Sequence, residues 1–175
     1  MSDDKQIIEG VEKGDESSCT EILNLYKGRI FSYILRIVKN YDDAEELTFE
    51  TFIKFFKTIR TYDKSRHLST WLFTIAHNIV IDFFRRNRIE YEYLDEKYST
   101  GESSAEKYER EKLSKAIDDA LQELAPVDRE IIILFHKEEL SYEEISKITN
   151  LPVTTIKTRL HRARKKLQSL LAENE

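Results

Sequence analysis

The sequence contains few of the residues that end helices, form tight turns or make covalent cross-links. Its 175 residues include four glycines, two prolines and one cysteine. Sheets and hairpins depend on turns that glycine and proline supply, so the scarcity of both residues favours an all-α fold. The single cysteine, Cys19, excludes a disulfide within the chain and fits a reducing compartment.

Segments that would carry the chain into or across a membrane are also lacking. No apolar run approaches the length of a membrane-spanning helix. The N-terminal sequence MSDDKQIIEG does not have the charged-then-apolar pattern of a signal peptide. We therefore expect a soluble, cytoplasmic protein without membrane insertion.

Patterns typical of catalysis or of metal binding do not occur in the sequence. The four histidines are not spaced as ligands with one another or with the cysteine: His67, His77, His136 and His161. There is no glycine-rich phosphate loop, and the carboxylates fall on predicted helix faces and in an acidic segment. We expect no enzymatic activity, no metal site and no cofactor.

Helical periodicity predicts two small helical domains. The first covers residues 1–88 and the second residues 113–175. Residues 89–112 between them are acidic, and residues 99–104 have no apolar period, which predicts a flexible linker with room for a helix near its C-terminal end. Helices are predicted over residues 16–38, 42–59, about 69–86 and 113–124, and from Pro126 onward.

Residues 140–167, LSYEEISKITNLPVTTIKTRLHRARKKL, have the pattern of two short helices joined by a tight turn. Ser141 and Glu144 form an S-x-x-E capping box, Asn150 suits a left-handed helix end, and Pro152 marks the next helix start. The second helix carries one apolar stripe: Val153, Ile156, Leu160, Ala163, Leu167 and Leu170. This is the layout of a helix-turn-helix, whose second helix lies in the DNA major groove.

The polar side of that second helix is strongly basic. No acidic residue occurs from Val153 to Ala172, although the chain as a whole has a net charge of −5. A local concentration of positive charge suits phosphate neutralisation, whereas a solvated helix surface is the simpler alternative. The candidate DNA-binding residues are Thr155, Lys157, Thr158, Arg159, His161, Arg162 and Lys165.

Two sets of motifs resemble the extracytoplasmic-function sigma factors of bacterial RNA polymerase. Residues 43–52 (DAEELTFETF), 68–72 (LSTWL) and 75–78 (IAHN) resemble region 2 of that family; residues 124–126 (LAP), 140–145 (LSYEEI) and 152–164 (PVTTIKTRLHRAR) resemble region 4. The chain departs from the family pattern at Phe49, where glutamine is usual, and at Asn150 and Thr154, where glycine is usual. The resemblance implies that the second domain recognises the −35 promoter element.

The resemblance also implies a docking helix for the core enzyme of RNA polymerase. In the family, the helix that carries the DAEE motif binds the clamp coiled coil, and region 4 meets the flap. The corresponding residues are Asp43, Glu45, Glu46, Phe49 and Glu50. Carboxylates in a first helical turn also complement the helix dipole, but that alternative does not explain Glu50, two turns in.

A third implied surface captures a base flipped out of the −10 element and holds the neighbouring backbone. An unstacked base needs an aromatic or apolar wall and an amide that reads its edge. Tyr62 is the candidate wall and Asn78 the candidate amide, whereas Trp71 is assigned to the core. The full set of −10 candidates is Tyr62, Arg66, His67, Asn78, Arg85 and Arg86.

The sequence therefore predicts a sigma factor with polymerase core enzyme, promoter DNA and an anti-sigma factor as partners. Two other classes stay open at this point. A conventional regulator would use the first domain for sensing or dimerisation and the helix-turn-helix for DNA binding. A helical adaptor would bind protein only.

Overall fold

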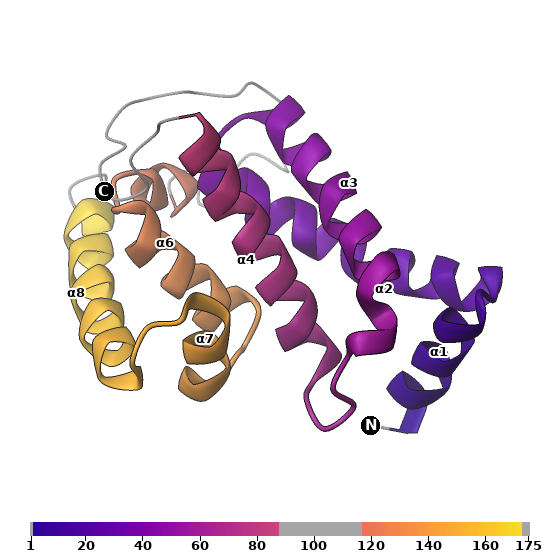
Figure 1. Ribbon diagram of the computed structural model, residues 1–175. Coiled ribbons are helices and arrows are strands. Elements are labelled where there is room, and N and C mark those ends of the chain that lie inside the picture. Colours follow the sequence, from indigo (N-terminus) through magenta and orange to yellow (C-terminus); the bar gives the residue numbers. More distant parts are fainter. Residues whose placement is uncertain (1, 88–116, 173–175) are drawn as a thin grey trace, which may run out of the picture.

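The computed structural model describes residues 2–87 and 117–172, and every regular element within these ranges is helical (Figure 1). The all-α prediction is confirmed for these ranges. The predicted linker, residues 89–112, lies outside the described residues, and so does the first part of the helix predicted over 113–124.

The N-terminal half, residues 2–87, is built from four α-helices and one short 3-10 helix. They are α1 (Ser2–Lys13), α2 (Glu16–Val38), α3 (Tyr41–Thr58), η1 (Ile59–Thr61) and α4 (Leu68–Arg86). Side-chain caps fix where two helices start: Asp15 accepts from the amide of Ser18 at 2.8 Å, and Asn40 accepts from that of Asp43 at 3.0 Å. These caps place α2 and α3 within a residue or so of their predicted bounds.

Two features of this half differ from the prediction. The sequence predicts Ser69 or Thr70 as the cap of α4, but the helix begins at Leu68 and His67 occupies the capping position without a side-chain bond. Thr70 instead donates to Glu144 of the C-terminal half at 2.8 Å. Helix α1 was not predicted as a separate element; its residues Ile8 and Val11 are buried, and α1 packs on α2.

The C-terminal half, residues 117–172, contains the helix-turn-helix. Residues 117–122 are helical and are followed by α6 (Pro126–Ile132), the π-helical segment η2 (Ile133–Lys137), α7 (Tyr142–Thr149) and α8 (Val153–Ala172). The capping box is present: the Ser141 amide donates to Glu144 at 2.9 Å, and the Glu144 amide donates to Ser141 Oγ at 3.2 Å. Asn150 has the expected left-handed conformation, with a φ of 57°.

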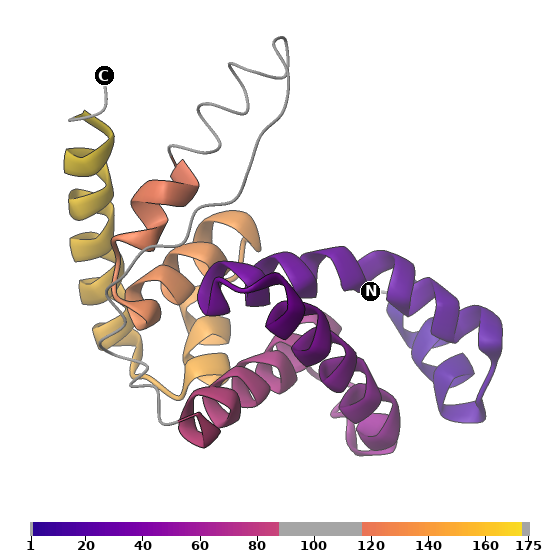
Figure 2. The ribbon, with the colours of Figure 1, turned by 90° about the horizontal axis from the view of Figure 1, so that it is seen from above.

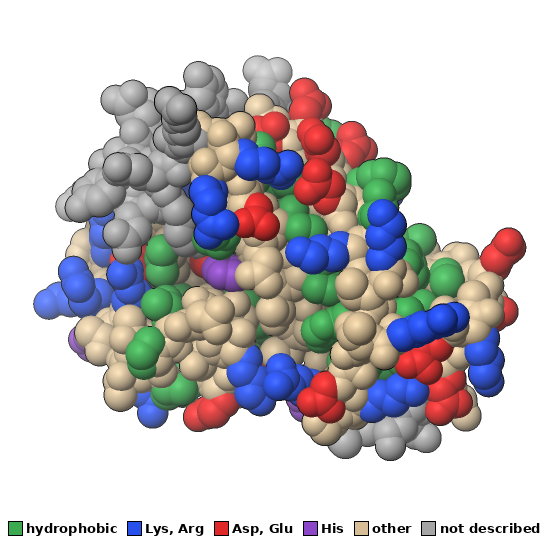
Figure 3. Space-filling view, in the orientation of Figure 1, with side chains coloured by type: hydrophobic (Ala, Val, Ile, Leu, Met, Phe, Trp, Pro, Cys, Tyr) green, Lys and Arg blue, Asp and Glu red, His purple; other side chains and the backbone are tan. Residues whose placement is uncertain are grey.

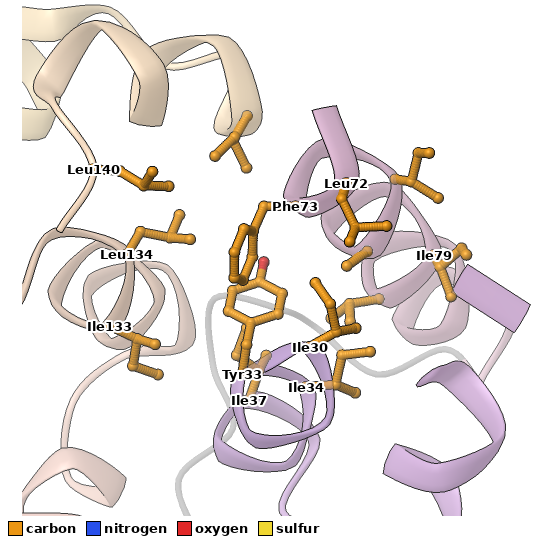
Figure 4. Packing of buried hydrophobic residues seen from close by; sticks show 14 of the residues in the cluster. Ile30, Tyr33, Ile34, Ile37, Leu72, Phe73, Ile79, Ile133, Leu134 and Leu140 are labelled. Atoms are coloured by element: carbon orange, nitrogen blue, oxygen red, sulfur yellow. The ribbon is translucent and has the colours of Figure 1, made fainter. Parts of the chain in front are cut away.

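The two halves pack directly against each other, with α6 on α2 and α7 on α4, as the view from above shows (Figure 2). The contact is apolar at its centre. Figure 4 shows the rings of Tyr33 and Phe73 lying between their own helices and the side chains of Leu134 and Leu140. The two rings meet edge to face with centroids 5.2 Å apart. We call this packing of α6 and α7 on α2 and α4 the closed arrangement.

A buried arginine of the C-terminal half, Arg129, donates hydrogen bonds to free carbonyls at the end of α2. Arg129 of α6 is 1% exposed, and its guanidinium donates to the carbonyls of Arg36 at 3.2 Å and Ile37 at 3.4 Å. These are among the last carbonyls of α2, which have no partner within the helix. Within its own half the same guanidinium donates to the carbonyls of Leu121, Gln122 and Leu124. Arg129 therefore ties the two halves together through backbone groups.

Candidate nucleic-acid and docking surfaces

The face of α8 that points away from the core carries most of the candidate DNA-binding residues. Ile156, Leu160 and Ala163 are buried beneath the helix, as the apolar stripe predicts. Thr158, His161, Arg162 and Lys165 are exposed on the opposite face, and Thr155 is half-buried at its edge. In Figure 3, Lys and Arg side chains line the edge of the molecule that α8 forms. This face presents cations and hydrogen-bonding groups side by side, as a major-groove reader requires.

Two predicted DNA-binding residues of α8 contact the domain itself. Arg159 forms an ion pair with Asp128 of α6, with Nη1 and Oδ1 2.9 Å apart. Lys157 places its ammonium 5.2 Å from the ring centroid of Tyr142 in α7. The period of the helix puts both residues on the flanks of the stripe, and their intramolecular partners could not be read from the sequence. The ion pair with Asp128 gives Arg159 a contact within the domain, and the DNA contact expected of Arg159 stays a prediction.

The residues predicted to read the −10 element lie along α4 and the loop before it. Arg66 and His67 are exposed in the loop, and Asn78 is exposed on α4 between buried neighbours. Arg85 and Arg86 are exposed at the C-terminal end of α4. Arg85 pairs with Asp82 at 2.9 Å, and Arg86 lies 3.7 Å from the Glu50 carboxylate of α3. The described structure therefore brings polar groups to one helix and its preceding loop.

Tyr62 does not form an open aromatic wall in this structure. It is 8% exposed, its ring lies 4.9 Å from that of Trp71, and its hydroxyl donates to the carbonyl of Arg66. The buried ring and the hydroxyl bond hold the loop in place, and the base-stacking role expected of Tyr62 stays a prediction. Trp71, predicted to belong to the core, is half-buried and also contacts Phe55.

A groove of about 880 Å³ runs between α2 and α3 beside the predicted docking residues. Phe49 is 68% exposed and Tyr41 61% exposed on its rim, while Phe31 and Phe52 line its wall. Large exposed aromatic side chains gathered in one place mark a protein contact surface rather than an ordinary solvated face. The groove has both an apolar lining and an acidic edge.

The acidic edge is formed by the predicted docking residues. Figure 3 shows acidic side chains gathered over the upper end of α3. Glu45 and Glu46 are exposed, and Asp43 and Glu50 are half-buried. Burial, together with the negative charges of Glu46 and Asp42, raises the pKa of Asp43. A basic partner would relieve the repulsion between these carboxylates, so the edge suits a positively charged protein surface.

A second hollow, of about 630 Å³, contains basic residues that the sequence did not single out. Lys54 and Lys57 of α3 line it together with Arg85 and Arg86 of α4. The three-residue spacing of the two lysines puts them on one helix face, which is the signal that could have found them. The hollow extends the basic end of α4 onto α3.

Other kinds of site are not supported within the described ranges. Among residues 2–87 and 117–172, no group of three histidine, cysteine, aspartate or glutamate side chains is arranged to hold a metal ion. No helix in the same ranges combines the length and apolar character needed to cross a membrane.

Comparison with known proteins defines the class of protein. Residues 22–89 match the family described as Sigma-70 region 2, and residues 114–167 match Sigma-70, region 4. Region 2 thus covers most of the N-terminal half and region 4 covers the helix-turn-helix. The chain is a sigma factor, which directs RNA polymerase to promoters for transcription initiation.

Curated relatives narrow this class to one family. The ECF RNA polymerase sigma factor SigW of Bacillus subtilis (strain 168) is 33% identical, over 97% of this chain and 97% of that protein. The ECF sigma factor SigM of the same organism is 30% identical, over 86% of this chain and 93% of that protein. The chain therefore belongs to the ECF family of RNA polymerase sigma factors.

Solved structures have the same fold. The sigma factor RpoE of Bartonella quintana, in complex with the anti-sigma factor NepR, matches with a TM-score of 0.72 at 25% identity, over 89% of this chain and 98% of that one. CnrH, in complex with the cytosolic domain of CnrY, also has a TM-score of 0.72, at 21% identity, over 98% of this chain and 99% of that one.

Proposed function

We propose that the two halves divide the work of promoter recognition as two domains, residues 1–88 and 113–175, joined by residues 89–112. The observation that carries this proposal is the separation of charge: an acidic, aromatic groove edge on α3 and a basic outward face on α8. The first suits a protein partner and the second suits DNA.

In this proposal, the core enzyme of RNA polymerase docks on α3. Asp43, Glu45, Glu46 and Glu50 face a basic partner, and Phe49 adds an apolar anchor beside them. Charged rim residues steer association, whereas a large aromatic side chain in a groove contributes most to affinity. Phenylalanine at position 49 makes this contact more apolar than the glutamine usual in the family would.

Promoter DNA meets α8 and α4 in the same proposal. Thr155, Thr158, His161, Arg162 and Lys165 read the −35 element. Asn78 reads a flipped base of the −10 element, with Arg66 and His67 near the strand and Arg85 and Arg86 on phosphates. Lys54 and Lys57 extend this phosphate surface onto α3.

We further propose that the chain acts in the cytoplasm by binding alone, without catalysis, and that an anti-sigma factor controls it. The support for this control is the Bartonella relative, which was solved with such a partner. An anti-sigma factor could act by holding the closed arrangement or by covering the groove between α2 and α3.

Reconstitution tests the proposal. The purified chain should co-elute with core polymerase and support initiation on a promoter template. Glu45→Lys should weaken co-elution, and the loss should shrink at high salt because exposed charges are screened. Lys64→Glu, on the loop before α4, is a control that should co-elute normally. A chain that binds promoter DNA specifically without polymerase would instead be a conventional regulator.

A further inference from the structure

The basic residues of α8 divide into two groups that point in different directions. With about 100° of rotation per residue, Lys157 and Arg164 lie one above the other on one flank of the apolar stripe. Arg159 and Lys166 form an equivalent row on the opposite flank. Each row lies roughly 80° from the centre of the stripe. The row of Lys157 and Arg164 lies about 90° or more from Arg162 and Lys165, whereas the row of Arg159 and Lys166 lies about 50° from Arg162 and about 110° from Lys165.

The first flank rests on two stacked rings. Phe135 of η2 and Tyr142 of α7 are stacked, with centroids 5.1 Å apart and planes inclined by 18°. Lys157 places its ammonium 5.2 Å from the centroid of Tyr142, and Arg164 places its guanidinium carbon 4.9 Å from that of Phe135. Each ring therefore carries one cation of α8, in the geometry of a cation–π contact.

A neutral histidine strengthens the end of this flank. Arg164 Nε donates to Nε2 of His136 at 2.9 Å, which requires that nitrogen to be unprotonated. Burial and the Arg164 cation lower the pKa of His136, which keeps the ring neutral.

The second flank is held by a carboxylate and a carbonyl. Arg159 pairs with Asp128 of α6 at 2.9 Å, and Lys166 donates to the backbone carbonyl of Glu123. The four cations thus contact four different segments: α6, η2, α7 and the turn that follows the helix over 117–122. Within residues 2–87 and 117–172, no hydrogen bond or ion pair joins the side chains of Arg162 or Lys165 to another residue.

This division matters because the buried part of α8 is narrow. Only Ile156, Leu160 and Ala163 are fully buried, and one of them is an alanine. A narrow apolar stripe resists lifting of the helix more than rotation about its axis. A rotation of a few tens of degrees would move Arg162 away from a base edge, because hydrogen bonds weaken steeply with misalignment. Contacts on both flanks prevent that rotation.

We propose that Lys157, Arg159, Arg164 and Lys166 are positioning residues, which clamp the recognition helix at a fixed rotation instead of neutralising promoter phosphates. This inference rests on the proposed role of α8 in −35 recognition. It reassigns Lys157 and Arg159, which are candidate DNA ligands by sequence, and leaves direct DNA contact to the outward face.

Two matched substitutions on the same helix test the proposal. Lys157→Met and Lys165→Met each remove one ammonium and keep an unbranched apolar side chain of similar length. Their holoenzymes are titrated against a promoter duplex selected from random sequence, at several salt concentrations. The melting temperature of each free chain is measured in parallel.

The measurements distinguish a residue that positions the helix from a residue that binds a phosphate. Lys157→Met should lower affinity about two- to fivefold, the value of one exposed cation–π contact, without changing the salt slope. Its melting temperature should fall by about 1–4 °C. Lys165→Met should leave the melting temperature unchanged and reduce the slope of log affinity against log salt by about 0.9.

The ring partner supplies an independent measurement. Tyr142→Leu should lower affinity and melting temperature at least as much as Lys157→Met, because it also removes the stack on Phe135. The double variant should lose little more than Tyr142→Leu alone. The proposal is overturned if Lys157→Met reduces the salt slope as Lys165→Met does, or if it changes neither affinity nor melting temperature. It is also overturned if the losses caused by Lys157→Met and Tyr142→Leu are additive in the double variant. If Lys165→Met and Arg162→Ala both leave affinity intact, the −35 role of α8 fails, while the melting temperatures still report on the clamp.

Discussion

His77 of α4 and Glu130 of α6 meet in the interior, with Nδ1 and Oε1 2.7 Å apart. Glu130 is 1% exposed and also accepts a hydrogen bond from the hydroxyl of Tyr33. Burial alone would lower the pKa of His77, but the charge and the hydrogen bond of Glu130 together outweigh it and raise the pKa above 6.5. One carboxylate thus joins two helices of the N-terminal half to the C-terminal half.

The His77–Glu130 pair makes stability depend on pH. Because the folded-state pKa of His77 is raised, its contribution is complete below the unfolded value of about 6.5 and is lost as the pH rises through the folded value. His77→Leu should lower the free energy of unfolding by about 3–5 kcal/mol at pH 6, and by less at pH 8. Urea titration at both pH values measures this. His161→Leu, on the exposed face of α8, is the control, and an equal loss at both pH values for His77→Leu would contradict the assignment.

Different residues of α8 should read the base sequence and bind the phosphates. Arg162→Ala should weaken binding of holoenzyme to its −35 element by about 1–3 kcal/mol and relax the sequence preference. Lys165→Ala should weaken binding to all sequences equally and reduce the salt dependence. Titration with matched and scrambled −35 duplexes checks both effects. Equal losses on the two duplexes for Arg162→Ala would reject its specificity role.

Asn78 should act after polymerase has bound. Its exposed amide suits the edge of a flipped base, so Asn78→Ala should leave core binding intact and impair opening of the promoter. Permanganate footprinting on duplex and on pre-melted templates measures opening directly. The defect should be smaller on the pre-melted template. A parallel loss of core binding would show that Asn78 is structural.

The closed arrangement should keep the free protein from binding both promoter elements at once. We expect weak binding of promoter duplex by the isolated chain, because polymerase must anchor each domain separately. A mobility-shift titration that finds nanomolar, spacing-dependent binding would contradict this expectation.

Arg29→Glu should loosen the same arrangement. Arg29 lies 2.8 Å from the buried carboxylate of Glu138, and the substitution would place two negative charges together away from water. The radius of gyration from X-ray scattering should increase while the helical circular dichroism is retained. Arg60→Glu, at an exposed position of η1, should change neither quantity.

Local chemistry made much of this fold predictable. Ser141 with Glu144 and Asn150 defined the start and end of α7, since capping and left-handed turns depend on neighbouring residues. The apolar period of α8 correctly gave Ile156 and Leu160 as buried. The resemblance to ECF sigma factors then gave the order of region 2 and region 4 along the chain, which helical periodicity alone does not provide.

Long-range contacts account for what the sequence did not predict. Trp71, on the next helix, covers the ring of Tyr62. Asp128, 31 residues earlier, pairs with Arg159. Neither partner follows from spacing along one helix. Contacts between the halves, such as those of Arg129, lie still further apart in sequence and depend on how two separate helical patterns pack.

The bonds from Arg129 to the last carbonyls of α2 have a consequence during synthesis of the chain. The ribosome completes α2 and α4 well before it adds Leu134 and Leu140, and the intervening stretch of roughly 50 residues takes about 3–10 s to translate. During that interval the end of α2 lacks its guanidinium, and the rings of Tyr33 and Phe73 lack their apolar cover. The nascent N-terminal half therefore exposes apolar surface, which favours aggregation, until α6 and α7 emerge.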